Sequence, residues 1–220
     1  MIKSLLRAAS VAALTILPLT TTMPAPAHAA ESLPLSQGIE RLAFAAESRD
    51  GYQRNSFKHW NAGKLDDGCN ARAEVLIAEA IEAPTVGERC SLTGGVWHSY
   101  YDGQHVTAAS ALDVDHMVPL AEAWDSGAWQ WTAVRREAYA NDLDAERSLV
   151  AVTARSNRAK ADKDPAQWLP PAAEVHCQYA ADWVATKLRW GLTLDAPEHD
   201  ALQLLVEGCA DTTVTFELVP

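Results

Sequence analysis

The sequence has little positive charge. It carries 18 lysine and arginine residues against 29 aspartate and glutamate residues, which gives a formal net charge of −11 at pH 7. Because nucleic-acid affinity depends largely on neutralising phosphates with lysine and arginine, so acidic a chain is not expected to bind polyanions over its whole surface. Any contact with a polyanion must therefore come from a local group of basic residues.

Long apolar runs and repeated segments are also missing. Beyond the N-terminal segment, no run is long and apolar enough to span a bilayer. The same part of the chain has no internal repeat and no low-complexity block. Apolar residues nevertheless make up 48% of the 220 residues, which is enough to bury a sizeable core. We therefore predict a single domain over residues 30–220.

The N-terminal segment, residues 1–29, has the three-part pattern of a secretory signal peptide. Lys3 and Arg7 give a positive start, residues 8–19 form a short apolar run, and Ala27-His28-Ala29 offers small side chains to a signal peptidase. A membrane anchor is the alternative, but the run is short and prolines interrupt the segment. We predict cleavage after residue 29 and export from the cell, which lowers the formal charge from −11 to −13.

Closely spaced cysteine pairs are absent, although the chain has four cysteines: Cys69, Cys90, Cys177 and Cys209. An even number in an exported chain predicts two disulfides, and four cysteines allow three pairings. We favour Cys69–Cys90 with Cys177–Cys209, because each bond would close a local unit. The alternative is a four-cysteine zinc site, and the chain lacks the close pairs that such sites use.

Hydrophobic periodicity and turn residues predict a mixture of helices and strands. The expected helices cover residues 36–47, 71–83, 119–141, 154–162, 172–190 and 197–208. The expected strands cover residues 96–101, 112–118, 148–153 and 212–219. The predicted fold class is α+β, with the strands near 112–118 and 148–153 and the helix at 154–162 at its core.

An aspartate stands beside a histidine at Asp115-His116, within a predicted strand. Magnesium prefers carboxylate and amide oxygens and keeps several waters, and a histidine of near-neutral pKa can take a proton from one of them. Neighbouring side chains of a strand point to opposite faces, so the two groups converge only at a strand end. Pro119 is consistent with such an end. We expect Asp113 to be solvated or to support this pair.

The second group of polar residues lies in the predicted helix at 154–162. Asn157 offers a metal a neutral oxygen ligand and shares a helix face with Lys160. The segment also supplies the local positive charge that the whole chain lacks. We predict nucleic-acid binding by the basic residues Arg155, Arg158, Lys160 and Lys163.

The order Asp-Val-Asp-His-x-Val-Pro, an apolar strand and Ser-Asn-Arg-x-Lys-x-Asp resembles the ββα-metal, or HNH, nuclease motif. It is particularly similar to exported bacterial HNH-family proteins of the GmrSD C-terminal type. The resemblance covers nearly the whole mature chain, and its specific part is the core at 112–164. It implies an α+β fold with a ββα-metal core, flanking helices and two stapling disulfides.

The resemblance also implies roles for individual residues. Asp115 and Asn157 match the metal ligands, which would hold one divalent ion, Mg²⁺ or Mn²⁺. His116 matches the general base, and products with 5′-phosphate ends are expected. Ser148 stands where the family usually has an asparagine that orients the histidine loop. Ser148 is therefore a departure from the pattern at the position that orients His116. A serine side chain can also form a hydrogen bond, but it is shorter than that of asparagine.

The predicted function is therefore secreted, metal-dependent hydrolysis of nucleic acid with little sequence preference. Little sequence preference is expected because no recognition module accompanies the core. DNA is the expected substrate and RNA the alternative. A second hypothesis is a non-enzymatic exported protein that keeps the HNH scaffold for binding, which Ser148 and the acidic charge favour. A third hypothesis is a zinc-dependent hydrolase of another substrate, but the sequence lacks the clustered histidine or cysteine ligands that such a zinc site needs.

Overall fold

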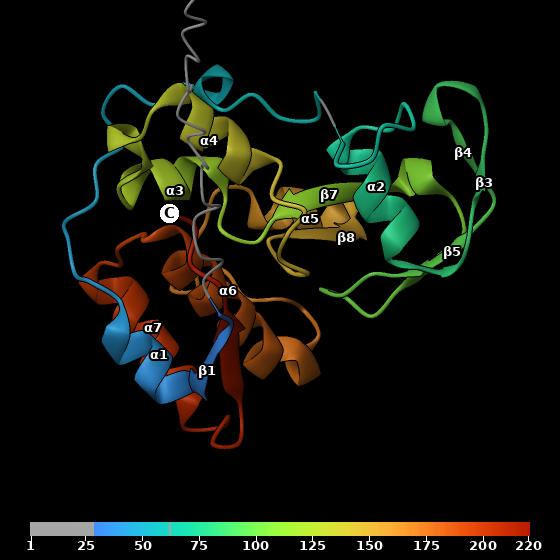
Figure 1. Ribbon diagram of the computed structural model, residues 1–220. Coiled ribbons are helices and arrows are strands. Elements are labelled where there is room, and N and C mark those ends of the chain that lie inside the picture. Colours follow the sequence, from blue (N-terminus) through green and yellow to red (C-terminus); the bar gives the residue numbers. More distant parts are fainter. Residues whose placement is uncertain (1–28, 62) are drawn as a thin grey trace, which may run out of the picture.

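A computed structural model describes residues 29–61 and 63–220 as a mixture of helices and small antiparallel sheets (Figure 1). The predicted signal peptide falls almost entirely outside the described residues. The helices are α1 (Leu35–Arg41), α2 (Ala71–Ala78), α3 (Leu120–Asp125), α4 (Ala133–Ala140), α5 (Ala154–Lys160), α6 (His176–Trp190) and α7 (Ala196–Val206). The strands are β1 (Glu31–Pro34), β2 (Ala80–Glu82), β3 (Thr85–Val86), β4 (Leu92–Thr93), β5 (Val96–His98), β6 (His105–Val106), β7 (Leu112–His116), β8 (Leu149–Thr153) and β9 (Thr213–Phe216).

The antiparallel pair β7–β8, followed directly by α5, lies at the middle of the molecule (Figure 1). Its register pairs Asp115 with Val150 and His116 with Leu149. Thr153 ends the second strand and caps the helix, because its side-chain oxygen accepts a hydrogen bond from the Ser156 N–H. The two strands and the helix predicted at 112–118, 148–153 and 154–162 are confirmed. The first strand and the helix end two residues earlier than predicted, and the second strand begins one residue later.

The two faces of β7–β8 pack against different parts of the chain. Leu112 and Val114 belong to a small apolar cluster with Trp97 and with residues of α2. Val150 and Val152 point the other way, into the main core that α6 dominates. Because side chains alternate along a strand, Asp113 and Asp115 share the face of Val150 and Val152. This alternation carries the acidic side chains toward α5.

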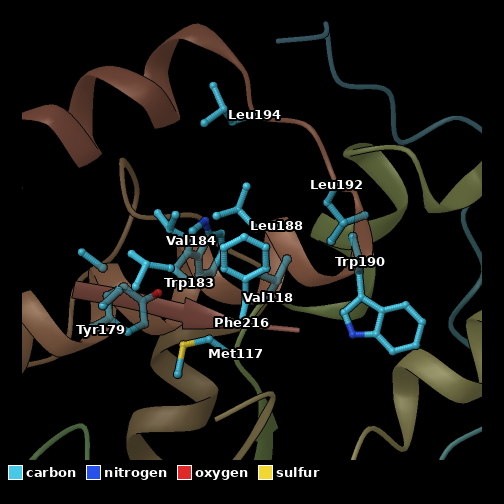
Figure 2. Close-up of a cluster of buried hydrophobic side chains, with 14 of the residues drawn as sticks. Met117, Val118, Tyr179, Trp183, Val184, Leu188, Trp190, Leu192, Leu194 and Phe216 are labelled. Atoms are coloured by element: carbon cyan, nitrogen blue, oxygen red, sulfur yellow. The ribbon is translucent and has the colours of Figure 1, made fainter. Parts of the chain in front are cut away.

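The main core forms around α6 and continues to the residues that follow β7. Figure 2 shows Met117 and Val118 among the buried side chains of Trp183, Leu188 and Phe216. The Met117 N–H also donates to the Ser148 carbonyl at 2.9 Å, which extends the pairing of the two strands by one residue. The chain just after the Asp115-His116 pair is therefore anchored in the core.

Helices α1, α6 and α7 pack together on one side of the molecule (Figure 1). Helix α6 ends at Gly191, whose φ of 66° lies in the left-handed region, and the Leu192 N–H returns to the Lys187 carbonyl at 2.9 Å. Strand β9 then returns to pair with β1, with Leu33 opposite Val214. The sequence pattern did not predict β1, because an edge strand of four residues carries little periodicity.

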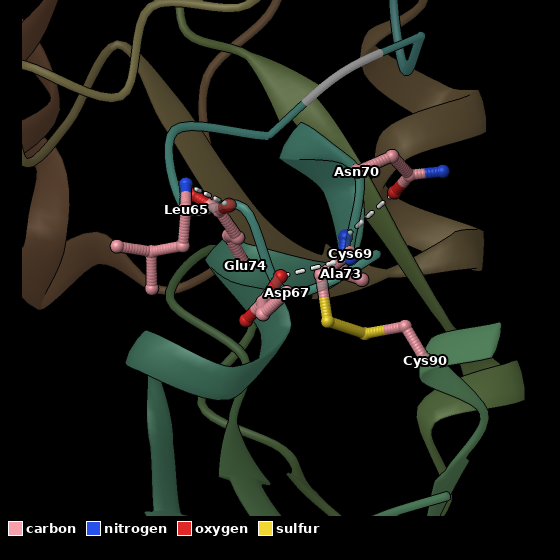
Figure 3. The surroundings of a disulfide bond; sticks show 7 residues. All are labelled: Leu65, Asp67, Cys69, Asn70, Ala73, Glu74 and Cys90. Atoms are coloured by element: carbon pink, nitrogen blue, oxygen red, sulfur yellow. Dashed lines mark hydrogen bonds between the residues drawn. A yellow bond between two sulfur atoms is a disulfide. The ribbon is translucent and has the colours of Figure 1, made fainter. Parts of the chain in front are cut away.

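Both favoured cysteine pairings are confirmed. Cys177–Cys209 links the start of α6 to the residues after α7, and Cys69–Cys90 links the start of α2 to the loop before β4. Figure 3 shows Cys69 next to Asn70, whose side chain caps α2 by accepting a hydrogen bond from the Ala73 N–H. Each bond closes a local unit, as the sequence predicts, because the paired residues lie 21 and 32 positions apart.

We expect the double variant Cys177→Ala/Cys209→Ala to lose about 2–4 kcal/mol of unfolding free energy, because the bond restricts the unfolded chain. Urea denaturation of the oxidised protein measures this loss. The matched control is Cys69→Ala/Cys90→Ala, which opens a shorter loop and should cost somewhat less. Equal stability of the wild type and both double variants would contradict the expectation.

Three predicted helices were too long. The helix expected at 36–47 ends at Arg41, and the helix expected at 71–83 ends at Ala78. Residues Ala80–Glu82 form β2 instead, because β5 offers them backbone partners. The helical region expected at 119–141 is broken into α3 and α4 at Gly127, whose φ of 120° suits glycine alone. Local composition identified the helix-forming residues but did not identify where strand pairing or a turn ends each helix.

No helix within residues 29–61 and 63–220 reaches the length and apolar character that crossing a bilayer requires.

Candidate active site

A cleft of about 380 Å³ opens where β7 ends and α5 packs against it. It is lined by His116 and Asp115 from β7, Asn157 and Arg158 from α5, and Tyr52 and Arg54 from the segment before α2. The structure thus brings the predicted base and both predicted metal ligands to one cavity. They come together because the strand ends at His116 and the helix begins directly after the partner strand.

Two larger cavities, of about 470 and 660 Å³, lie at the loop 142–149 and contain neither Asp115, His116 nor Asn157. Volume alone would favour these cavities as the functional site. We place the site in the smaller cleft, because chemistry requires a base, oxygen ligands and positive charge at one place. The smaller cleft holds the Asp115-His116 pair together with Asn157 and Arg158, whereas the two larger cavities contain none of these four residues.

Asp115 is held by two buried donors. Its Oδ2 accepts hydrogen bonds from the Tyr101 hydroxyl at 2.8 Å and from the Lys160 ammonium at 2.6 Å. Burial raises the pKa of the Asp115 carboxyl, and the adjacent Lys160 opposes this rise by favouring the charged form. Its Oδ1 accepts no hydrogen bond from residues 29–61 or 63–220, so one carboxylate oxygen is left for a cation.

His116 is buried, and its Nε2 lies 2.9 Å from the carbonyl oxygen of Ala140, the last residue of α4. Because a carbonyl oxygen only accepts, this contact places the ring proton on Nε2. Burial lowers the pKa of His116 to about 3, so the imidazole is neutral at pH 7. The Nδ1 lone pair is then free to take a proton.

Asn157 lies next to Asp113 rather than alone. Its Nδ2 donates to Oδ2 of Asp113 at 3.1 Å, which joins α5 to β7 on the face that carries Asp115. The amide nitrogen is used in this bond, so the amide oxygen of Asn157 is left for a ligand. Asp113 is half-buried, and the side-chain contact that the structure gives it is this bond from Asn157 rather than one with Asp115 or His116.

The expected orienting role of the Ser148 side chain is not what the structure shows. Its hydroxyl donates to Oδ2 of Asp142 at 2.8 Å, and only its backbone carbonyl contacts the strand end, through Met117. The carbonyl of Ala140 holds the His116 ring instead. Asp142 fixes this region, because Arg189 and Trp190 of α6 also donate to its carboxylate. Backbone from the end of α4 supplies the acceptor for the His116 ring.

Lys160 was wrongly predicted to bind nucleic acid. Its side chain is fully buried, pairs with Asp115 and donates a second hydrogen bond to the His116 carbonyl at 2.9 Å. The rings of Tyr101 and Trp183 lie 5.7 and 5.8 Å from its ammonium. Lys160 lies one turn after Asn157 on the same face of α5. Because Asn157 faces the site, Lys160 points inward as well, rather than to solvent.

The other predicted basic residues lie nearer the surface. Arg155 and Arg158 are exposed, and Arg158 lines the cleft. Lys163 is half-buried and donates to the Ala159 carbonyl at 2.9 Å. The group predicted as one basic patch is therefore divided into two exposed arginines, one tethered lysine and one buried lysine (Lys160). Arg158 is the member best placed to meet a phosphate in the cleft.

The sequence prediction assigned no role in the site to the segment that forms the other wall of the cleft, although Tyr52-Gln53-Arg54 belongs to the wider family resemblance. Tyr52 and Arg54 line the cleft, and Arg49 binds this segment to the rest of the site. Arg49 donates to both oxygens of Asp125 at 2.8 and 2.6 Å and to Asp162 at 2.5 Å. Because Asp162 also lines the cleft, this pairing offsets a negative charge that would repel phosphate. An isolated arginine in a loop carries no periodic signal.

Trp60 was also missed as part of the site. Its indole is stacked on the His116 imidazole, with ring centroids 5.2 Å apart and planes 25° apart. Its backbone φ is 59°, a left-handed conformation that costs a bulky residue on the order of 1–3 kcal/mol. Such a conformation persists only where surrounding contacts hold it, and it is found next to the predicted base.

Acidic groups close enough to hold a cation are found elsewhere, between α3, α6 and α7. They are Glu47 with Glu122 and Asp125, and Glu47 with Asp195 and Glu198. The buried ammonium of Lys187 lies among them, 2.9 Å from Glu122 and 2.6 Å from Glu198. Lys187 therefore supplies the positive charge that a cation would otherwise supply. These acidic groups form buried ion pairs that join the helices.

Comparison with known proteins relates this chain to one family. The family model described as "GmrSD restriction endonucleases, C-terminal domain" matches residues 74–203. An uncharacterized secreted protein of Arthroderma benhamiae is 37% identical over 191 residues, covering 84% of this chain and 92% of that protein. No solved structure gives a significant match.

Proposed function

The chain belongs to the family of GmrSD restriction endonuclease C-terminal domains, and we propose that it is a metal-dependent HNH-type endonuclease. Its substrate is nucleic acid, with DNA first and RNA as the alternative. The observation that carries this proposal is the cleft that His116 lines together with Asp115, Asn157 and Arg158. Two disulfides and a secreted relative are consistent with a protein that acts outside the cell.

The proposed general base is His116. The hydrogen bond from Nε2 to the Ala140 carbonyl holds the neutral ring in one tautomer, with Nδ1 unprotonated. In this role Nδ1 removes a proton from the water that attacks the phosphorus. Burial lowers the pKa of His116 below the near-neutral value expected from the sequence, so the ring is unprotonated across the neutral range but is a weaker base than a solvated histidine.

Asp115 and Asn157 are the proposed ligands of one divalent cation, Mg²⁺ or Mn²⁺. Their donor atoms are a carboxylate oxygen and an amide oxygen, which such hard cations prefer. The fit is supported by the uncommitted Oδ1 of Asp115 and by the amide of Asn157, whose nitrogen is already bonded to Asp113. When bound, the cation would stabilise negative charge that develops on the phosphate and on the leaving oxygen.

Two arginines on opposite elements are proposed to hold the sugar-phosphate backbone. Arg158 comes from α5 and Arg54 from the segment before α2, and both line the cleft. Arg155 is exposed one turn earlier on the helix and could bind a neighbouring phosphate. A few local arginines can serve an acidic protein in this way, because the attraction acts mainly within about a Debye length.

The test is a plasmid-nicking assay on the secreted, oxidised protein with Mg²⁺, Mn²⁺ or EDTA. We expect nicking and then linearisation with either metal, and none with EDTA, because the phosphate charge is then not stabilised. Adding excess Mg²⁺ to the EDTA sample is the control and should restore cleavage. Ligation of the products tests the expected 5′-phosphate ends.

Cleavage that persists in EDTA would contradict the metal-dependent mechanism. The absence of cleavage of double-stranded DNA, single-stranded DNA and RNA with both metals would favour the second hypothesis, an exported binding protein on the same scaffold. The ion pair between Lys160 and Asp115 is the structural observation that favours this alternative, because it engages one oxygen of a proposed metal ligand. A nucleic-acid binding assay on the same preparation then tests it directly.

A further inference from the structure

The His116 imidazole lies among aromatic rings that restrict its motion. The Trp60 indole is stacked on it at 5.2 Å and 25°, and the Tyr139 ring lies nearly parallel at 6.3 Å and 19°. The His59 ring meets it edge-on at 6.1 Å. Stacked planes oppose rotation of the imidazole about its last side-chain bond, because rotation would drive its edge into a neighbouring ring.

The side chain of Asn141 holds the backbone of Trp60. Oδ1 of Asn141 accepts a hydrogen bond from the backbone N–H of Trp60 at 2.9 Å. Its Nδ2 donates to the carbonyls of Lys58 and Glu137, both at 2.8 Å. The Asn141 carboxamide thus joins the segment before Trp60 to α4 through both its oxygen and its nitrogen. These bonds account for the left-handed backbone at Trp60, which a bulky residue does not adopt alone.

The two contacts that fix His116 originate from neighbouring residues. Ala140 provides the carbonyl that accepts from Nε2, and Asn141 accepts a hydrogen bond from the backbone N–H of Trp60, whose indole covers the ring. The end of α4 therefore sets both the rotation and the tautomer of the imidazole. Phe57, which is fully buried and packs edge-on against Tyr139, anchors the segment that carries Trp60.

We propose that Trp60 and Asn141 are positioning residues that fix the orientation of the His116 imidazole, so that its Nδ1 faces the cleft. This inference rests on the proposed function for its catalytic consequence. Neither residue needs to touch substrate in this role. A small displacement of a general base lowers the rate of the chemical step rather than the affinity for substrate.

The first test compares kcat and KM of Trp60→Ala and Trp60→Phe on an oligonucleotide with a single scissile region. Trp60→Ala should lower kcat by about 10²-fold with little change in KM, as expected when a reacting group loses its orientation. Trp60→Phe keeps a stacking ring and should recover most of the rate. The matched control is Trp129→Ala, which removes an exposed indole outside the cleft.

Asn141→Ala is the second variant, and it should lower kcat in the same direction as Trp60→Ala. Thermal unfolding of each variant checks that the protein is folded before kinetics are compared. A rise in KM at unchanged kcat would overturn the proposal, because Trp60 would then contact substrate. Unchanged kcat and KM in folded Trp60→Ala would overturn it as well.

A readout without substrate separates this inference from the proposed function. The stacked indole should shift the ring-proton NMR signals of His116 upfield, and a His116→Ala spectrum identifies them. Trp60→Ala should move these signals downfield, whereas Trp129→Ala should leave them in place. A wild type that cleaves nothing but shows the shift would refute the proposed nuclease alone. Signals of His116 that Trp60→Ala leaves unmoved would refute the positioning role alone.

Discussion

Replacing His116 by alanine is expected to reduce kcat by about 10²–10⁴-fold, because the only proposed base of the cleft is removed. The residual rate reflects metal and phosphate contacts that remain. Cleavage of a labelled oligonucleotide in Mg²⁺ or Mn²⁺, quantified at saturating substrate, measures the effect. KM should change little, because the buried ring has no proposed contact with the flanking phosphates.

The matched control for this variant is His105→Ala. His105 is exposed on β6 and faces His98 across the strand pair, outside the cleft. It should cleave at the wild-type rate. A folded His116→Ala protein with wild-type kcat would remove His116 from the mechanism and leave only the metal ligands as candidates.

Replacing Lys160 by methionine is expected to lower the free energy of unfolding by about 3–5 kcal/mol, since it leaves a buried carboxylate without its counter-charge. Methionine keeps most of the side-chain volume, so the loss reports on charge rather than on a cavity. Urea denaturation at pH 7 measures it. If Lys160 instead bound phosphate at the surface, stability would not change and KM would rise.

Two further variants separate the causes of this loss. Lys163→Met removes a half-buried lysine three residues away and should change stability by no more than about 0.5 kcal/mol. The double variant Lys160→Met/Asp115→Asn should recover part of the loss, because the unpaired charge is then gone. A loss below about 1 kcal/mol for Lys160→Met would contradict a strong buried pair.

Local sequence patterns were sufficient for the core elements. The strand near 148–153 is a short apolar run, the strand near 112–118 ends just before Pro119, and the helix at 154–162 follows a threonine that caps it. The cysteine pairs were predictable because each pair is close in sequence. The approach of Asp115, His116 and Asn157 followed from the same local order, since a strand pair and the next helix pack on one another.

The surroundings of the site depend on segments that are distant in the sequence. Lys160 turns inward because Tyr101 and Trp183, from a loop and from α6, cover its helix face. Ala140 orients His116 through a backbone carbonyl, and a carbonyl leaves no mark in a sequence. The stacking of Trp60 depends on Asn141, 81 positions further along the chain.

The sequence by itself thus determined the family, the order of the core elements, the disulfides and which side chains we propose as the site. These properties come from residue identity and short-range spacing. Only the tertiary structure decided which lysine is buried, which carbonyl holds the histidine and which indole covers it. These contacts depend on the packing of elements far apart in the chain, where many side chains compete for the same space and one arrangement buries the most surface with its polar groups paired.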